Sequence, residues 1–189
     1  MLNIKNDEDV MYVTSAAKKI MLFFDMDGTL NHFDTNATLE EVKSKGYMLN
    51  RIAIEKMVNL ALVLKLQGFD VNILSAVYQN GYSEEEKNRW LDNHSLQGIN
   101  RFFVPCGTDK GLVIKSLQRE NPDKTLVLID DYSPNLFSWE KAGGVGIKFY
   151  NGINGTNGTW ANLGKFSLYK NESIQEMNKK IMWIANVYS

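Results

Sequence analysis

The chain has 189 residues, of which 44% are hydrophobic and 23% charged, and a net charge of -1, which suits one soluble domain, 1–189, with a small insertion. The near-zero charge excludes binding of a nucleic-acid polymer by bulk electrostatics, and the single cysteine, Cys106, excludes an internal disulfide or a thiolate zinc cluster. No apolar run has the length of a membrane span and the polar, acidic first residues are unlike a signal peptide, so we expect a cytoplasmic protein without a membrane partner.

The predicted elements alternate between short apolar runs and helical patterns. Short apolar runs bounded by turn residues indicate buried strands, and apolar residues at intervals of three or four indicate helices. In chain order we expect an edge strand at 10–13, strand 20–24, a small cap at about 31–48, helix 50–67, strand 69–74, helix 83–94, strand 101–104, helix 109–120, strand 125–129, a helix after 133, strand 145–147, a loop or hairpin turn at 151–159 and helix 172–187.

Residues suited to capping stand at several predicted helix starts. They are Asn50, Ser83 with Glu86 three residues on, Ser133, and Ser173 or Asn171. The alternation of strands and helices predicts an α/β fold with a Rossmann-like, three-layer α/β/α parallel sheet. The cap would be inserted after the first core strand.

The first core strand ends abruptly in two carboxylates. Asp25 and Asp27 lie two residues apart, so in regular strand geometry they face the same way. Gly28 and Thr29 then let the chain turn. The carboxyl end of a buried parallel strand is where open α/β sheets bind ligands. The plainer alternative is an acidic turn after a core strand.

Two more polar residues stand at the ends of predicted elements. Ser75 closes the second core strand, and read alone it is a common strand-end serine. Lys110 stands at a predicted helix start, where the helix dipole disfavours a cation. A cation and a helix N-terminus together make an anion site, which favours a functional role. Lys115 is the rival candidate, but it lies about a turn further along the helix.

A second apolar strand, 125–129, also ends in paired acids, Asp130 and Asp131. Carboxylates crowded at one sheet edge repel each other, and a divalent cation removes that repulsion. Oxygen ligands suit Mg²⁺, which takes one or two carboxylates plus substrate phosphate.

Taken in order, these residues resemble the four motifs of the haloacid dehalogenase (HAD) superfamily. Asp25-Met26-Asp27-Gly28-Thr29-Leu30 matches the first motif, Ser75 the second, Lys110 the third and the pair Asp130-Asp131 the fourth. The resemblance covers 20–147.

The resemblance implies a Mg²⁺-dependent phosphomonoester hydrolase. In it Asp25 is the nucleophile that forms an aspartyl-phosphate, and Asp27 is the general acid and then the base for water. Mg²⁺ is held by the side chains of Asp25 and Asp130 and by the backbone carbonyl of Asp27, with Asp131 acting through water. Ser75 and Lys110 hold the phosphoryl oxygens.

Within the HAD phosphatases, three features resemble the 5'(3')-deoxyribonucleotidase group. They are Phe33, placed like a base-stacking aromatic, the segment 86–91 after the second motif, and the segment 128–135, in which Asn135 could brace the acidic pair. This resemblance implies that Phe33, Ser75, Ala76 and Lys110 contact a substrate that is a nucleoside monophosphate. The chain departs from the group at Thr29, His32 and the Ala76-Val77 pair, and its cap is shorter.

Two alternatives stay open beside a nucleotidase. The same machinery could hydrolyse sugar phosphates or other small phosphate esters. A protein of this fold could also bind a phosphorylated ligand without turnover, because fold alone does not establish activity. The sequence leaves the oligomeric state open.

Overall fold

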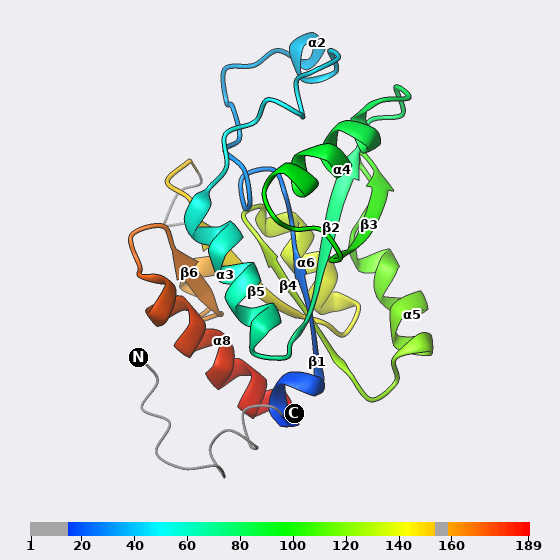
Figure 1. The fold of residues 1–189 in the computed structure, drawn as a ribbon. Helices are drawn as coiled ribbons and strands as arrows, with labels where there is room; N and C mark the ends of the chain where they lie inside the picture. Colours follow the sequence, from blue (N-terminus) through cyan, green and yellow to red (C-terminus); the bar gives the residue numbers. More distant parts are fainter. Residues whose placement is uncertain (1–14, 154–158) are drawn as a thin grey trace.

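The computed structural model describes residues 15–153 and 159–189 (Figure 1). Within these residues the strands form a six-stranded sheet in the order β3-β2-β1-β4-β5-β6, and every neighbouring pair is parallel. The strands are β1 (Ile20–Phe24), β2 (Asp70–Val77), β3 (Asn100–Pro105), β4 (Thr125–Asp130), β5 (Val145–Tyr150) and β6 (Ser167–Tyr169). The edge strand predicted at 10–13 lies outside the described residues.

Helices cover both faces of the sheet. They are a helical turn at 15–18, α2 (Leu39–Val42), α3 (Glu55–Leu66), α4 (Ser83–Asn93), α5 (Gly111–Glu120), α6 (Ser133–Lys141), α7 (Thr159–Asn162) and α8 (Ile174–Tyr188). α3, α4 and α8 pack on one face, and α5 and α6 pack on the other (Figure 1). The three-layer α/β/α fold predicted from the alternating pattern is therefore confirmed. None of these helices is long and apolar enough to cross a membrane.

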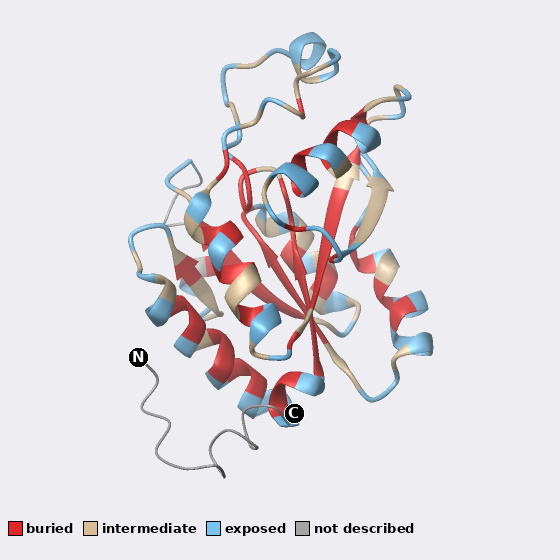
Figure 2. Ribbon diagram, in the orientation of Figure 1, coloured by how far each residue is buried: buried red, intermediate tan, exposed pale blue. Residues whose placement is uncertain are grey.

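The central strand β1 contributes to two hydrophobic cores, because successive side chains of a strand point to opposite faces. Ile20, Leu22 and Phe24 join the core under α3, α4 and α8. Met21 and Phe23 join the core under α5 and α6. Figure 2 shows the central strands buried between exposed helix surfaces, whereas the edge strand β3 is only partly buried. Burial on both faces explains why the strand reads as an unbroken apolar run.

Several predicted boundaries differ from the structure. β6 was missed because it has only three residues, too few to give a periodic signal. α3 begins at Glu55, and its N-cap is Ile54 rather than Asn50. The C-terminal helix has the predicted start, because Ser173 caps it and forms a capping box with Glu176.

Two serines predicted as caps lie inside their helices instead. Ser83 and Ser133 are the first residues of α4 and α6, and the N-cap positions belong to Tyr82 and Tyr132. Glu86 therefore forms no capping box with Ser83. Its carboxylate instead accepts hydrogen bonds from the backbone N–H groups of Gly46 and Met48.

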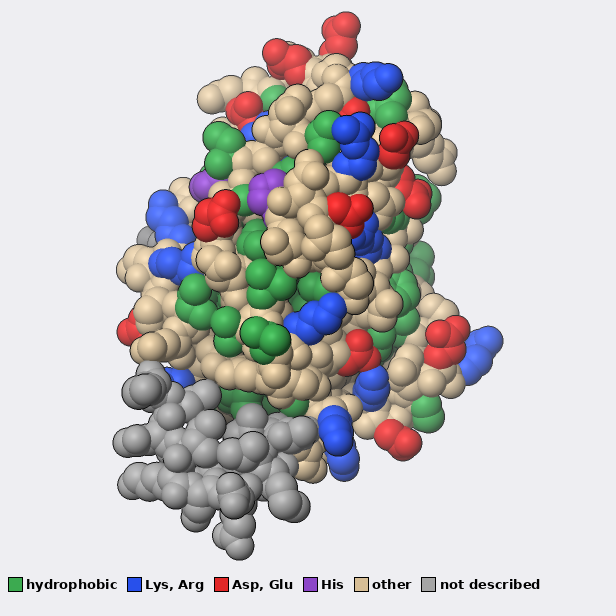
Figure 3. Space-filling model, viewed as in Figure 1, with side chains coloured by type: hydrophobic (Ala, Val, Ile, Leu, Met, Phe, Trp, Pro, Cys, Tyr) green, Lys and Arg blue, Asp and Glu red, His purple; other side chains and the backbone are tan. Residues whose placement is uncertain are grey.

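The segment between β1 and α3 extends beyond the carboxyl end of β1 and carries the short helix α2, at the top of Figure 1. Its backbone is fastened to α4 by Glu86 and by Tyr82, whose hydroxyl donates to the carbonyl of Lys43. On the face seen in Figure 3, basic and acidic side chains are interspersed, in keeping with a net charge of -1.

The strand order places a topological switch between β1 and β4. From β1 the chain proceeds to β2 and β3 on one side, and the second half proceeds from β4 to β5 and β6 on the other. In open α/β sheets the carboxyl ends of the two strands at such a switch flank a crevice in which ligands bind. Here the two strand ends carry Asp25 and Asp130.

Candidate active site

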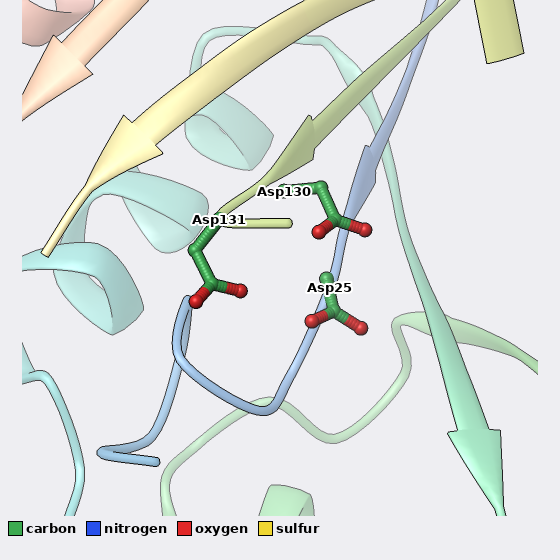
Figure 4. Close-up of side chains that lie close together, drawn as sticks. All are labelled: Asp25, Asp130 and Asp131. Carbon is green, nitrogen blue, oxygen red and sulfur yellow. The ribbon is translucent and has the colours of Figure 1, made fainter. Parts of the chain in front are cut away.

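Three carboxylates converge at the switch between β1 and β4. Asp25 follows β1, and Asp130 and Asp131 stand at the end of β4 (Figure 4). One carboxylate oxygen from each of the three lies within 4.8 Å of the others, and all three side chains are buried. The parallel pairing fixes this arrangement, because the backbone N–H of Asp25 donates to the carbonyl of Ile129 at 3.0 Å. The two acidic strand ends thus form a single cluster.

A buried lysine bridges two of these carboxylates. The Nζ atom of Lys110 donates to Asp25 Oδ1 and to Asp130 Oδ2, each at 2.7 Å. Lys110 is the N-cap residue of α5. The helix can lie this close because Gly111 packs against α6, where an added Cβ would be 2.4 Å from the carbonyl oxygen of Ser138. Lys115, the rival candidate, is exposed on α5.

The cluster holds more negative charge than its lysine neutralises. Burial raises the pKa of Asp25 to about 6, since the nearby Asp130 and Asp27 reinforce burial while Lys110 opposes it. Burial alone would lower the pKa of Lys110, but the carboxylates of Asp130 and Asp25 outweigh it and raise that pKa above its ordinary value. The two pKa shifts thus differ in cause, since burial dominates for Asp25 and attraction to the carboxylates dominates for Lys110.

Backbone and amide groups orient Asp130. Its Oδ1 accepts from the backbone N–H of Tyr132 at 2.7 Å, and its Oδ2 accepts from the side-chain amide of Asn135 at 2.9 Å. Asn135 therefore braces the acidic pair, as the sequence suggested.

Two residues in or directly after β5 hold Asp131, and one of them also bonds to the turn after β1. Asn151 donates from one side-chain amide to Asp131 Oδ2 and to the carbonyl of Gly28, each at 2.9 Å. Lys148 donates to the backbone carbonyl of Asp131 at 2.5 Å. Gly28 has a φ of +85°, and a Cβ there would lie 2.2 Å from Asp131 Oδ2. The absence of a side chain at Gly28 is what lets this carboxylate reach the cluster.

A second group of polar residues lies on the β2 side of β1, around Asp27. The Nζ atom of Lys87 donates to Asp27 Oδ2 at 2.5 Å, to Ser75 Oγ at 2.8 Å and to the carbonyl of Ala76 at 2.7 Å. The other carboxylate oxygen of Asp27 accepts from the amide of Asn31 at 3.3 Å. The structure thus brings Asp27, Ser75 and Ala76 together around Lys87.

Sequence reasoning gave Lys87 no role. A signal was nevertheless present, because Lys87 shares a helical stripe with Ser83, Trp90 and Leu91, at intervals of three and four residues. A lysine on an apolar stripe is an unusual core residue, since its ammonium needs polar partners inside the protein.

A cavity of about 790 Å³ opens over both groups of residues. Asp25, Asp27, Lys110 and Asp131 line it on one side, and Phe33 and Ala76 border it. Phe33 is 46% exposed, so its ring is available to a ligand. Ser75 is fully buried and does not line this cavity. A smaller cavity of about 160 Å³ shares Asp27, Phe33 and Ala76 and extends under the 31–48 segment.

Comparisons with known proteins establish the fold alone. No protein-family model matches the chain, and no curated protein matches it. Solved structures do match. One is a D,D-heptose 1,7-bisphosphate phosphatase from B. bronchiseptica complexed with magnesium and phosphate, with a TM-score of 0.57 and 16% identity over 87% of this chain and 99% of that one.

Two further solved structures agree with the first. One is a phospho-aspartyl intermediate analogue of phosphoserine phosphatase, with a TM-score of 0.57 and 15% identity over 86% of this chain and 98% of that one. The other is a HAD-superfamily hydrolase from Ehrlichia chaffeensis, with a TM-score of 0.51 and 13% identity over 88% of this chain and 97% of that one. The chain therefore has a HAD-like fold, as its sequence motifs predicted.

Proposed function

We propose that this protein is a Mg²⁺-dependent phosphomonoester hydrolase that acts through an aspartyl-phosphate. One observation carries the proposal: the acidic ends of β1 and β4 and the ammonium of Lys110 meet in one buried cluster that lines a cavity. Three buried carboxylates gathered at one point are costly to keep for structure alone, because like charges repel each other. Such a cluster suits a site completed by a cation and an anionic substrate.

The residues present fit Mg²⁺. The donor atoms are carboxylate oxygens, which this ion prefers, and three of them are already gathered within 4.8 Å. We assign Asp25, Asp130 and the backbone carbonyl of Asp27 as direct ligands, with Asp131 acting through water. When bound, Mg²⁺ offsets the negative charge that would otherwise keep a phosphate ester away from Asp25.

The chain's own groups divide the reaction between them. The Asp25 carboxylate attacks phosphorus, and Asp27 gives a proton to the leaving oxygen as the P–O bond breaks. Water then hydrolyses the aspartyl-phosphate while Asp27 takes a proton from it. Lys110 and the hydroxyl of Ser75 hold the phosphoryl oxygens, which gain charge in the transition state.

The favoured substrate is a nucleoside monophosphate. Phe33 supports this assignment, because its exposed ring lies on the cavity beside Asp27 and Ala76, where a base could stack. We place the segment 31–48 as a small cap that shapes this end of the site.

Sugar phosphates are the second candidate substrates, and the cavity is large enough to hold them. A cavity of about 790 Å³ has room for several kinds of small ester. Two of the similar structures are phosphatases named for a heptose bisphosphate and for phosphoserine, so the likeness in fold does not favour a nucleotide. A non-catalytic protein that binds a phosphorylated ligand is the remaining alternative.

Phosphate release from a panel of 5'- and 3'-nucleoside monophosphates and sugar phosphates, with Mg²⁺ or EDTA, tests the proposal. We expect Mg²⁺-dependent release that Asp25→Asn abolishes, with nucleotides preferred. Release from sugar phosphates alone would keep the mechanism and discard the nucleotide. A folded protein that binds Mg²⁺ and releases phosphate from no ester would favour the non-catalytic alternative.

A further inference from the structure

Lys87 is fully buried, yet its ammonium has a partner for each of its three hydrogens. The partners are Asp27 Oδ2, Ser75 Oγ and the carbonyl of Ala76, at 2.5, 2.8 and 2.7 Å. Two of these three belong to residues that the proposed function places against the phosphate ester. A buried ammonium is costly to keep, so a site that satisfies it completely is a specific arrangement rather than chance packing.

The helix that carries Lys87 is fastened to the segment between β1 and α3 at two points. The neighbouring Glu86 binds the backbone N–H groups of Gly46 and Met48, and the indole of Trp90 donates to the carbonyl of Arg51 at 2.7 Å. The first turns of α4 therefore cannot shift without breaking these hydrogen bonds to the segment between β1 and α3. Lys87 itself lines neither cavity, and its ammonium is fully bonded to Asp27, Ser75 and Ala76, so it would act through these residues.

We propose that Lys87 is a positioning residue that fixes the carboxylate of Asp27 and the hydroxyl of Ser75 for proton transfer to the leaving oxygen. This inference rests on the proposed function. Lys87 holds Asp27 Oδ2 while Asn31 approaches Oδ1, so the carboxylate plane has a defined direction. The same ammonium accounts for one lone pair of the Ser75 hydroxyl and leaves its hydrogen free to donate to a phosphoryl oxygen.

The ion pair serves both halves of the reaction. When the proton passes from Asp27 to the leaving oxygen, the bonding electrons of the P–O bond stay on that oxygen and the negative charge appears on the Asp27 carboxylate, next to Lys87. When water attacks the aspartyl-phosphate, the same carboxylate takes the proton of that water. In the first step the ammonium stabilises the carboxylate that forms, and in the second step it holds that carboxylate in the position from which it accepts the proton.

A purely structural lysine and a positioning lysine differ in how their loss depends on the leaving group. Nitrophenolate leaves without needing a proton, whereas an alkoxide needs one from Asp27. A structural defect would therefore slow both kinds of ester alike. Misplacing Asp27 would slow the alkyl ester far more, because general-acid catalysis contributes roughly 10²- to 10⁴-fold only where a proton is required.

The experiment measures kcat and KM of the Mg²⁺-loaded protein with 4-nitrophenyl phosphate and with the alkyl phosphate it hydrolyses fastest. Lys87→Met removes the ammonium, and Lys87→Gln keeps an amide donor for the Ala76 carbonyl in case the methionine variant fails to fold. We expect kcat/KM, which reports the steps up to departure of the leaving group, to fall about 100-fold or more for the alkyl ester and about 10-fold or less for the aryl ester. In an Asp27→Asn background, Lys87→Gln should add little further loss, because the two residues act as a unit.

Lys56→Met is the matched control. Lys56 also donates two hydrogen bonds to backbone carbonyls, those of Lys170 and Glu172, at 2.7 and 2.6 Å, but it is on α3, outside the cluster. Its loss should change stability and not the ratio of the two rates. Equal losses with both esters in the Lys87 variants, or none, would overturn this inference alone. A wild-type protein that hydrolyses neither ester would overturn the proposed function first.

Discussion

Two buried lysines flank the end of β1, and their surroundings differ in kind. Lys110, toward β4, bonds to Asp25 and Asp130, with Asp131 close by, and it borders the cavity. Lys87, toward β2, has one carboxylate, one hydroxyl and one carbonyl around it and is sealed from the cavity. The first cluster gathers three carboxylates around Lys110, whereas the second pairs one carboxylate with one ammonium.

The difference teaches how one strand end can serve two tasks. A cluster of several carboxylates can take up a further cation, so the β4 side is suited to Mg²⁺ and, through that ion and Lys110, to phosphate. A cluster that is already neutral gains nothing from another ion, so the β2 side is suited to holding side chains still. The predictions below test whether this division is real.

The largest effect is expected from Lys110→Met. Its loss leaves buried carboxylates without their cation, which costs about 3–5 kcal/mol of unfolding free energy in the metal-free protein. We expect Mg²⁺ to restore much of that loss, because the ion supplies positive charge to the same carboxylates. Mg²⁺ should restore little in Lys87→Met. Denaturant unfolding with Mg²⁺ or EDTA measures the unfolding free energy of each variant. Equal stabilisation of both variants by Mg²⁺ would show that the two sides of β1 do not differ in this way.

Gly28→Ala should disturb the β4 side selectively. The new Cβ would lie 2.2 Å from Asp131 Oδ2, so this carboxylate must move. We expect Mg²⁺ affinity to fall about 10- to 100-fold, as it does when groups around a metal site are lost. Gly81→Ala is the control, since Gly81 has a similar φ of +82° but no atom within 4 Å of the added Cβ. Titration calorimetry should find its affinity unchanged, and a parallel loss in both would assign the effect to backbone strain.

A pH dependence should appear on the β4 side through Asp25. Its pKa is raised from 3.8 to about 6 by burial, so the metal-free protein carries the proton below pH 6 and Mg²⁺ must displace it. Below pH 6 the affinity for Mg²⁺ should therefore decrease, by about tenfold for each further pH unit.

The metal-free protein should show the opposite trend in stability. Because the folded pKa of Asp25 exceeds the unfolded one, its contribution is largest at low pH and is lost as pH rises through 6. Asp25→Asn should remove both trends. Unaltered pH profiles in that variant would assign them to another group.

The smallest effect is expected from Phe33→Ala, and it sharpens the assignment of substrate. The ring is 46% exposed, so its loss should change the unfolding free energy by no more than about 0.5 kcal/mol. Stacking on a base is worth about 1–3 kcal/mol, which predicts a rise in KM of roughly 5- to 100-fold for nucleotides. A sugar phosphate should be affected far less, and Phe33→Tyr should retain most of the affinity. Equal changes for both substrate classes would exclude base stacking.

The β4 side was largely predictable from the sequence because its signals are local. Asp25 and Asp130 each follow an apolar strand, and parallel strands present their carboxyl ends at one edge. Lys110 stands out at a helix start where the dipole opposes it. The alternation of apolar runs and helical stripes was likewise sufficient for the three-layer fold.

On the β2 side Asp27, Ser75 and Ala76 were expected in the site, but the lysine that joins them was not predicted, because its contacts join segments far apart in the chain. Lys87 reaches Asp27, 60 residues earlier. Glu86, expected to cap its own helix, bonds instead to Gly46, 40 residues earlier. β6 was missed for a different reason, since three residues give no period. Local pattern thus predicted the acidic residues and Lys110, but not Lys87.

The central position of β1 governs when the site can form during folding. In the sheet, Ile20 pairs with Thr125 on one side and Met21 with Asp70 on the other, so neither pairing is local. Sheets built from such distant pairings fold slowly, because chain entropy is lost before contacts form. A chain that is being synthesised cannot bind Mg²⁺ at this cluster until Asp131 has emerged. Metal uptake would then report the pairing of β1 with β4 and stabilise that part of the sheet.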